Sequence, residues 1–371
     1  MGSPYEDGCI LALAGGPVQT GHPVNRGTVL RTMARLATLV LLIVLAAAPA
    51  AEAAAPKLKV MTRNIFLGGN IALPIGAPTR AEFEQRATQL WQQVETTDFP
   101  VRAKLLAREV RRTKPDLIGL QEVAHWRRDR TTTVYDFLAL LRAELRRAGL
   151  RYRVGSVQEE ADIEAPISLG YSVRLTMRDV ILVRARKGLR VRRRLGGNFK
   201  AEFPVDTPVG RLISRRGWTA IDATLRGERF RFVNTHLESF ADDLRLQQAR
   251  ALLAGPLRKR GRVILAGDLN SDPEGATGAN PAAYRALTRA GLKDTWLSVR
   301  PRSKGWSCCS KQEVAMDPPP IPFDHRVDHV LAKGRVRVLG GRVIGDDPAN
   351  RTASGLWPSD HGGAVMTLRL G

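Results

Sequence analysis

An apolar run followed at once by an acid and an amide is the feature that most restricts how this chain can fold. Residues 262–266 read Arg-Val-Ile-Leu-Ala, which predicts a buried strand, and Gly267-Asp268-Leu269-Asn270 follows directly. Side chains alternate along a strand, so Asp268 and Asn270 can face one side of its C-terminal end. A carboxylate and an amide placed there suit a water molecule, a metal ion and a phosphate oxygen. Gly-Asp-x-Asn is also an ordinary turn composition, so the rest of the chain has to decide between the two interpretations.

Strand-like and helical patterns alternate in mixed order along the rest of the chain. Apolar runs and period-two alternation predict strands at 57–64, 116–121, 152–157, 179–185, 218–225, 229–235, 263–266, 326–331 and 363–370. Helices are predicted at 80–94, 101–112, 135–148, 242–253 and 282–290. A turn at Arg226-Gly227-Glu228 joins two of these strands into a hairpin, which excludes a simple doubly wound parallel sheet. We therefore predict an α/β fold in which two sheets pack face to face with helices outside.

The N-terminal segment has the pattern of a secretion leader. Arg31 and Arg35 precede an apolar run over 36–48, and Ala51-Glu52-Ala53 follows as a small-residue cleavage site. The apolar run is shorter than the roughly 20 residues that a membrane-spanning helix needs. We therefore predict a signal peptide over 1–53 and a secreted protein.

Two further boundaries follow from the same region. Met33 stands where a signal peptide would begin, so residues 1–32 are a candidate upstream extension from a mis-called start. From residue 57 onward the chain shows no long linker, no repeat and no shift in composition. Residues 54–371 are therefore predicted to form one domain.

Charge and cysteine usage narrow the class of partner. The 371 residues carry a formal net charge of +22, which favours polyanions such as nucleic acid, an anionic membrane face or phosphorylated small molecules. Most of the 58 basic residues are Arg, however, and a GC-rich coding bias accounts for the same excess of positive charge.

Cys308 and Cys309 are adjacent, which excludes a disulfide framework and leaves open a vicinal disulfide, a reactive pair or two half-buried thiols.

Polar residues recur where the predicted strands begin or end. Singly, an Asn or Asp at a strand end is more often a turn cap. A whole ordered series of them is very improbable by chance. In chain order the series is Asn64, Glu122, Arg178, Asp179, Asn234, His236, Asp268, Asn270, Asp328, Asp360 and His361.

With these motifs in this order, the chain resembles the endonuclease/exonuclease/phosphatase superfamily from about residue 57 to residue 370. The matching motifs are Asn64-Ile65-Phe66, Gln121-Glu122, Asn234-Thr235-His236-Leu237, Gly267-Asp268-Leu269-Asn270, Asp328-His329 and Ser359-Asp360-His361. The resemblance implies a four-layer α/β/β/α sandwich of two mixed β-sheets, with helices on the outer faces and one active site at the strand ends. It also implies metal-dependent hydrolysis of a phosphoester.

The residue types agree with the roles that the resemblance implies. The predicted metal ligands are Asn64, Glu122 and Asp360, an oxygen-rich set suited to Mg²⁺ or Mn²⁺. The predicted catalytic residues are His236, Asp268, Asn270, Asp328 and His361. In this scheme Asp268 orients or deprotonates the attacking water, and Asn270 binds the phosphoryl group. The imidazoles of His236 and His361 flank the phosphate, and Asp328 orients His361. Arg178 and Asn234 are the predicted substrate-binding residues.

Two departures from the superfamily pattern bear on specificity. Met177-Arg178-Asp179 stands where apurinic endonucleases carry a Tyr, which weakens apurinic-site specificity. The carboxylate that pairs with His236 in deoxyribonuclease I-like members has no clear match, and Glu160, Asp162 and Glu164 are the candidates.

The sequence therefore predicts a secreted metal-dependent phosphodiesterase, with DNA or RNA as the leading substrate. The alternative enzyme is a sphingomyelinase-like or phospholipase C-like esterase acting on phospholipid, although no exposed aromatic hairpin is evident. A non-catalytic polyanion-binding protein would need a lost site residue, and every core position is present. The Arg-rich stretch 184–194 is either a phosphate-tracking stripe or a solvated hairpin. No stable protein partner is predicted, and a monomer is expected.

Overall fold

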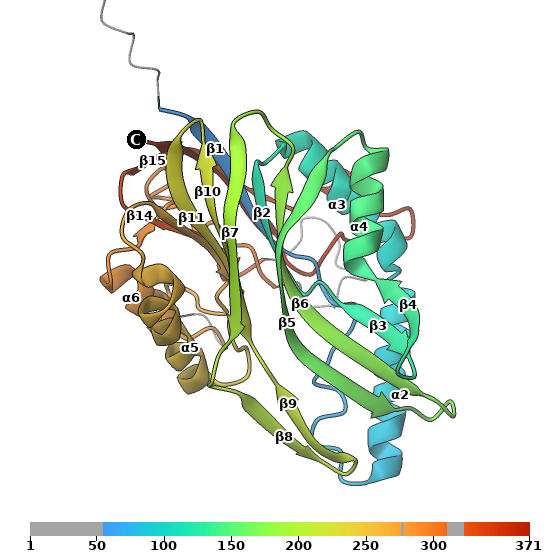
Figure 1. Ribbon diagram of the computed structural model, residues 1–371. Helices are drawn as coiled ribbons and strands as arrows, with labels where there is room; N and C mark the ends of the chain where they lie inside the picture. The colour runs from blue at the N-terminus through green and yellow to red at the C-terminus, as the bar shows by residue number, and fades with distance from the viewer. Residues whose placement is uncertain (1–54, 276–277, 310–322) are drawn as a thin grey trace, which may run out of the picture. The chain divides into compact units, whose positions relative to one another are not determined.

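The computed structural model describes residues 55–275, 278–309 and 323–371, which form two large mixed β-sheets and a separate two-stranded sheet. Figure 1 shows the two large sheets facing each other, with the helices on their outer sides. The predicted sandwich of two mixed sheets is confirmed. The predicted signal peptide and upstream extension lie outside the described residues. In the described part of the chain, no helix has both the length and the apolar character needed to cross a membrane.

The sheets are built from segments far apart in the sequence. In pairing order, the eight-stranded sheet contains β15 (Val336–Ile344), β16 (Gly363–Leu370), β1 (Lys57–Asn64), β2 (Leu117–Gln121), β6 (Ser172–Arg184), β3 (His125–Arg128) and β4 (Thr132–Asp136), and β5 (Tyr152–Pro166) pairs with β6. The six-stranded sheet contains β13 (Lys293–Asp294), β14 (Asp328–Lys333), β12 (Val263–Asp268), β11 (Glu228–His236), β10 (Gly217–Leu225) and β7 (Leu189–Asn198). The separate hairpin consists of β8 (Phe203–Thr207) and β9 (Gly210–Ser214).

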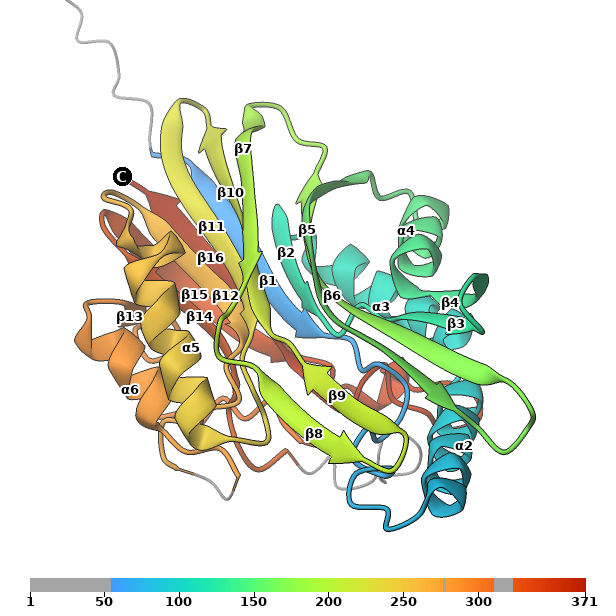
Figure 2. The same cartoon turned by 60° about the horizontal axis from the view of Figure 1, so that its bottom comes forward.

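Helices cover both outer faces and bury three apolar layers. In Figure 2, α5 (Asp242–Ala254) and α6 (Ala282–Arg289) lie outside the six-stranded sheet, and α2 (Arg80–Thr96), α3 (Phe99–Thr113) and α4 (Phe137–Arg147) lie on the opposite side of the molecule. Strand alternation places Val60 in the core between the sheets and its neighbour Met61 in the core beneath α2–α4. Each fully buried aliphatic or aromatic side chain contributes roughly 1.5–3 kcal/mol. Apolar burial on both faces of each sheet therefore accounts for the four layers.

Capping and turn chemistry explain where several elements begin. The predicted hairpin at Arg226-Gly227 is confirmed, and these residues have φ values of 49° and 90°, as a two-residue type I′ turn requires. The helix predicted over 135–148 begins later, at Phe137, because Tyr135 belongs to β4 and the Asp136 carboxylate caps the helix by accepting from Leu138 N.

The Arg-rich stretch 184–194 spans the end of β6, a turn and the first half of β7. β7 is the edge strand of the six-stranded sheet, and Arg190, Arg192, Arg193 and Arg194 are exposed on it. The β7 part of the stretch is therefore an edge strand with solvated arginines, and its affinity for polyanions remains a prediction.

Candidate active site

Strand register collects the predicted site residues at one edge of the sandwich. His236 lies opposite Asp268 across the parallel β11–β12 pair, and Asp268 lies opposite Asp328 across β12–β14. In the other sheet, Asn64 lies opposite Gln121, beside Glu122. We call this group the strand-end cluster; its members are Asn64, Glu122, His236, Asp268, Asn270, Asp328, Asp360 and His361.

Asp268 is the centre of the strand-end cluster and is almost fully buried. Its Oδ1 accepts from the backbone N–H of Asn270 at 2.9 Å, and its Oδ2 accepts from Asn64 Nδ2 at 3.1 Å. The same Oδ2 lies 3.5 Å from His236 Nε2 and 3.7 Å from His361 Nε2. One carboxylate oxygen therefore faces both imidazoles.

His361 is held in its charged form by two carboxylates. Its Nδ1 donates to Asp328 Oδ2 at 3.0 Å, and Ser307 Oγ donates to the same oxygen at 2.8 Å. Burial opposes the imidazolium, but Asp328 and Asp268 outweigh it and raise the pKa of His361 well above its ordinary value. The predicted orienting role of Asp328 agrees with this geometry.

His236 has the opposite electrostatic environment. Its Nδ1 lies 2.9 Å from Arg216 Nη1, and because a guanidinium can only donate, Nδ1 accepts and Nε2 carries the proton. Burial, reinforced by the charge of Arg216, lowers the pKa of His236 well below its ordinary value. The N–H of Nε2 faces Asp268 Oδ2 at 3.5 Å. Asn270 Nδ2 lies 3.1 Å from Nε2 but is itself a donor, to Leu237 O, so these two nitrogens are neighbours without a hydrogen bond between them. The two imidazoles therefore differ in charge, with His236 neutral and His361 protonated.

Arg216 is the residue that sequence reasoning missed. It is buried, and its guanidinium lies 3.9 Å from Glu160 and 3.7 Å from Glu238. Arg216 directly precedes β10 in an Arg-Arg pair, so nothing in its sequence context separates it from the many exposed arginines.

Of the three carboxylates suggested as partners of His236, the structure brings only Glu160 near it. Ligand atoms of Glu160, Asp179 and His236 lie within 4.8 Å of one another, and burial raises the pKa of Glu160 to about 8. Asp162 instead pairs with Arg127 and Arg174. Glu164 accepts from Ser172 and pairs with Arg130. The hydrogen-bond partner of His236 Nδ1 is thus Arg216, and none of the three carboxylates takes that position.

Of the predicted metal ligands, Glu122 and Asp360 line the cleft, and Asn64 is buried behind them with its amide bonded to Glu122. Glu122 adopts a left-handed φ of 56° and accepts from Leu67 N at 2.8 Å and Asn64 Nδ2 at 3.0 Å. Burial and the neighbouring charge of Asp360 raise the pKa of Glu122. Two carboxylates that repel each other in this way are an all-oxygen donor set that fits a hard divalent cation. The oxygen of the Asn64 amide, Oδ1, accepts a hydrogen bond from Phe66 N. Its nitrogen, Nδ2, donates to both Glu122 and Asp268 and so orients these two carboxylates.

The two predicted substrate-binding residues do not join the strand-end cluster. Asn234 is fully buried between the sheets, where its amide contacts the carbonyls of Leu120 and Val180 and the side chain of Gln121. A Cβ added at Gly119 would lie 2.5 Å from Asn234 Oδ1, so the close approach of the sheets depends on this glycine. The assignment of Asn234 to substrate binding is therefore corrected. Asn234 shares the inward-facing side of β11 with His236 but lies two residues before the end of the strand, deeper between the sheets.

Arg178 is also engaged away from the cluster. Its Nε donates to Val123 O at 2.9 Å, and its Nη2 donates to Asp136 Oδ1 at 2.6 Å and to Ala124 O. These contacts brace the loop that follows Glu122. Arg178 is therefore a structural support of the site in this structure, and its predicted contact with phosphate has no geometric basis here.

A cleft of about 250 Å³ opens onto the strand-end cluster. The cluster members that line it are Glu122, His236, Asp268, Asn270, Asp360 and His361. Phe66, Ile71, Met177 and Phe240 are apolar residues of the lining, and Arg216 lines the cleft as well. Asp328 lies behind His361, as expected for a residue that acts through the imidazole.

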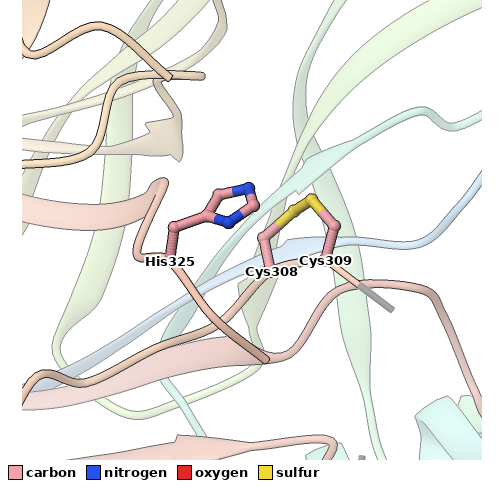
Figure 3. Close-up of side chains that lie close together, drawn as sticks. All are labelled: Cys308, Cys309 and His325. Carbon is pink, nitrogen blue, oxygen red and sulfur yellow. A yellow bond between two sulfur atoms is a disulfide. The ribbon is translucent and has the colours of Figure 1, made fainter. Parts of the chain in front are cut away.

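Two adjacent cysteines border the cluster. The structure joins Cys308 and Cys309 by a vicinal disulfide, and Figure 3 shows the pair beside His325. Cys308 is buried, with its Sγ 3.5 Å from His361 Nε2, and its backbone pairs with that of His325. Of the three alternatives left open by the sequence, the structure contains the vicinal disulfide.

Fold and cluster together define an α/β sandwich hydrolase with a buried carboxylate and two imidazoles at its strand ends. The family model described as "Endonuclease/Exonuclease/phosphatase family" matches residues 90–361, and the chain belongs to this family of hydrolases. No curated protein sequence matches the chain significantly.

Solved structures share the fold at low sequence identity. An endonuclease/exonuclease/phosphatase family protein from Bacteroides thetaiotaomicron is 16% identical with a TM-score of 0.56, over 85% of this chain and 99% of that one. A mannosyl-6-phosphatase from the same species is 17% identical with a TM-score of 0.55, over 84% and 99%. D. rerio TDP2, crystallised with a single-strand DNA product, is 18% identical with a TM-score of 0.50, over 84% and 99%. At these identities the likeness shows the fold alone.

Proposed function

We propose that this protein is a metal-dependent phosphodiesterase whose reaction takes place at the strand-end cluster. The observation that carries this proposal is the position of Asp268 Oδ2, which faces a neutral and a protonated imidazole beside the carboxylates of Glu122 and Asp360. This arrangement supplies a proton acceptor, a proton donor and a cation-binding edge around a single cleft.

Each residue then has a distinct task. Asp268, fixed by Asn270 N and Asn64, accepts the proton of the attacking water. His361, charged and oriented by Asp328, donates from Nε2 to the phosphoryl or leaving oxygen, where negative charge develops. His236 stays neutral and donates a hydrogen bond from Nε2, while Asn270 holds the same side of the cleft.

Glu122 and Asp360, with the Asn64 oxygen if its amide turns, would hold Mg²⁺ or Mn²⁺. When bound, such an ion withdraws charge from the phosphoryl oxygens during in-line displacement. The raised pKa of Glu122 fits this assignment, because a cation would favour the ionised form of both carboxylates.

For the substrate, nucleic acid is the class that charge supports. The chain carries a net charge of +22, and four arginines of β7 are exposed. A protein of the same fold, D. rerio TDP2, was crystallised with a DNA product. A phosphodiester with an apolar substituent, such as a phospholipid, is the second candidate, and the apolar residues of the cleft lining favour it.

We also propose that the protein is secreted after cleavage near Ala53, which the leader pattern over residues 31–53 supports. N-terminal sequencing of protein from the culture supernatant should give a first residue of Ala54 or Ala55. Retention in the cell with residues 36–48 uncleaved would contradict secretion.

The reaction can be tested with purified residues 54–371 and bis(4-nitrophenyl) phosphate, supercoiled plasmid, RNA and sphingomyelin, each with Mg²⁺ and with EDTA. We expect hydrolysis of at least one phosphodiester that stops in EDTA and returns with added Mg²⁺. Turnover that persists in EDTA, or none on any of the four, would contradict the proposal.

A further inference from the structure

An apolar cavity of about 110 Å³ lies next to the catalytic cleft. Its walls are formed almost entirely by aliphatic and aromatic side chains from α2, β3, β5, β6, the β8–β9 hairpin and the chain that follows β1. These residues include Ile75, Phe83, Leu90, Trp126, Ile163 and Leu175. Because a void in a protein interior forfeits van der Waals contacts, an apolar cavity that remains unfilled is costly.

The β8–β9 hairpin forms one wall of this cavity through one of its faces. Phe203, Val205 and Thr207 of β8 line the cavity, whereas Pro204 and Asp206 are exposed. On β9, Leu212 lines it and lies opposite Val205, whereas Ile213 pairs with Pro204 and is not among the lining residues. The hairpin pairs with neither large sheet, as Figure 2 shows, so no sheet hydrogen bonding explains its position over the cavity.

The cavity and the catalytic cleft adjoin, because some of their lining residues are the same. Ile71, Met177, Arg216 and Phe240 line both of them. Arg216 lines the cavity and also contacts His236 of the strand-end cluster. Only this one residue therefore stands between the cavity and His236. Phe240 is 43% exposed and stacks on Phe203 of the hairpin at a centroid distance of 5.7 Å, which places an aromatic pair at the entrance.

We propose that this cavity binds the apolar substituent of a phosphoester whose phosphate lies in the strand-end cluster. This proposal rests on the proposed function. Of the two candidate substrate classes, the cavity favours an alkyl phosphoester, the chemistry of a phospholipid, over the nucleic acid that net charge favours. Polar side chains are few in the lining (Thr207, Ser214, Arg215 and Arg216), and a nucleobase buried there would leave much of its hydrogen-bonding edge unpaired. An engineered cavity of about 150 Å³ binds benzene, so this volume takes on the order of five carbon atoms.

Direct binding tests the cavity separately from catalysis. Methyl, butyl and hexyl phosphate would be titrated into the Mg²⁺-loaded protein by calorimetry, so that only the apolar group varies. We expect Kd to fall on the order of threefold for each added methylene until the cavity is full, with an increasingly negative heat-capacity change. The same Kd for methyl and hexyl phosphate would overturn the proposal. Tighter binding of thymidine 5′-monophosphate than of hexyl phosphate would also overturn it and would indicate a nucleotide site.

Two neighbouring substitutions supply a matched control. Leu212→Asn places an amide of similar size in the cavity wall and should abolish the dependence of Kd on chain length. Ile213→Asn makes the same kind of change on the other face of the hairpin and should leave the dependence intact. The readout is the ratio of hexyl to methyl affinity within one protein, which does not depend on the folded fraction. Equal loss in both variants would overturn the assignment of the cavity. Metal-dependent hydrolysis without any chain-length effect would refute this inference alone and leave the proposed function standing.

Discussion

Arg216 donates a hydrogen bond to Nδ1 of His236 over 2.9 Å, whereas the candidate partners of His236 in the sequence were the carboxylates of Glu160, Asp162 and Glu164. The consequence is an asymmetric pair of imidazoles. His361 is paired with Asp328 and carries a proton, whereas His236 is paired with a cation and remains neutral. Burial together with the charge of Arg216 therefore favours neutral His236, whereas Asp328 and Asp268 favour the charged form of His361.

Removing Arg216 should destabilise the fold. Arg216→Gln leaves buried Glu160 and Glu238 without their cation, which should cost about 3 kcal/mol. Urea unfolding measures this cost. Arg215→Gln is the matched control, because Arg215 is exposed and pairs with Glu202 at the surface, and its effect should stay within about 0.5 kcal/mol. Equal stabilities for the two variants would contradict the electrostatic role assigned to Arg216.

The two histidines of the strand-end cluster should act on turnover. His236→Ala and His361→Ala should each lower kcat far more than they raise KM, because imidazole contacts strengthen in the transition state. His125→Ala should be nearly silent, since His125 contacts Thr133 and does not line the cleft. Steady-state kinetics on bis(4-nitrophenyl) phosphate decide this. An essential His125 with a dispensable His236 would show that the site is misplaced.

Asn234 should matter for stability and not for substrate affinity. Asn234→Ala leaves buried groups of Leu120 and Gln121 without partners, at about 1–3 kcal/mol for each unsatisfied group. Urea unfolding and KM, measured on the same preparation, separate the two roles. A raised KM at unchanged stability would restore the substrate-binding role predicted from the sequence.

His329 should make the fold sensitive to acid. Burial and the charge of Arg326 lower the pKa of His329 to about 4, from an ordinary value of 6.5. Between these values the unfolded chain binds the proton more readily, so stability is complete above pH 6.5 and falls as pH drops towards 4, by on the order of 3 kcal/mol. Urea unfolding at several pH values should show a shallower decline in His329→Gln. Identical pH profiles for the two proteins would refute this assignment.

Much of the fold was predictable because its strands carry strong local patterns. β1, β2, β11, β12 and β16 are apolar runs buried on both faces, and the β10–β11 turn has its own Gly signal. The strands missed were β3, which lies between β6 and β4, the edge strands β4, β7, β13 and β15, and the two strands of the isolated hairpin. β7, β8 and β9 expose alternate residues and are rich in Arg, Gly or Pro, so their strand character depends on neighbours that the local sequence does not specify.

The strand-end cluster was predictable for the same reason, because each member directly follows or precedes a recognisable strand. The contacts of Arg216, Arg178 and Asn234 could not be predicted from the sequence. A local pattern places a residue at a strand end but does not say which sheet face or which distant partner its side chain meets. Arg63 and Arg102 illustrate the point: both are buried, and both bind backbone carbonyls of the loops that carry the site.

The role of Glu122 tests the central claim most directly. Hydrolysis of bis(4-nitrophenyl) phosphate would be measured for wild type, Glu122→Gln and the exposed control Glu159→Gln, first in EDTA and then across a Mg²⁺ titration. If the strand-end cluster is a metal-dependent phosphodiesterase site, wild type and Glu159→Gln lose activity in EDTA and regain it with Mg²⁺. Glu122→Gln should stay on the order of 100-fold slower at saturating Mg²⁺. Full activity of Glu122→Gln, or wild-type turnover that is indifferent to EDTA, would contradict the account.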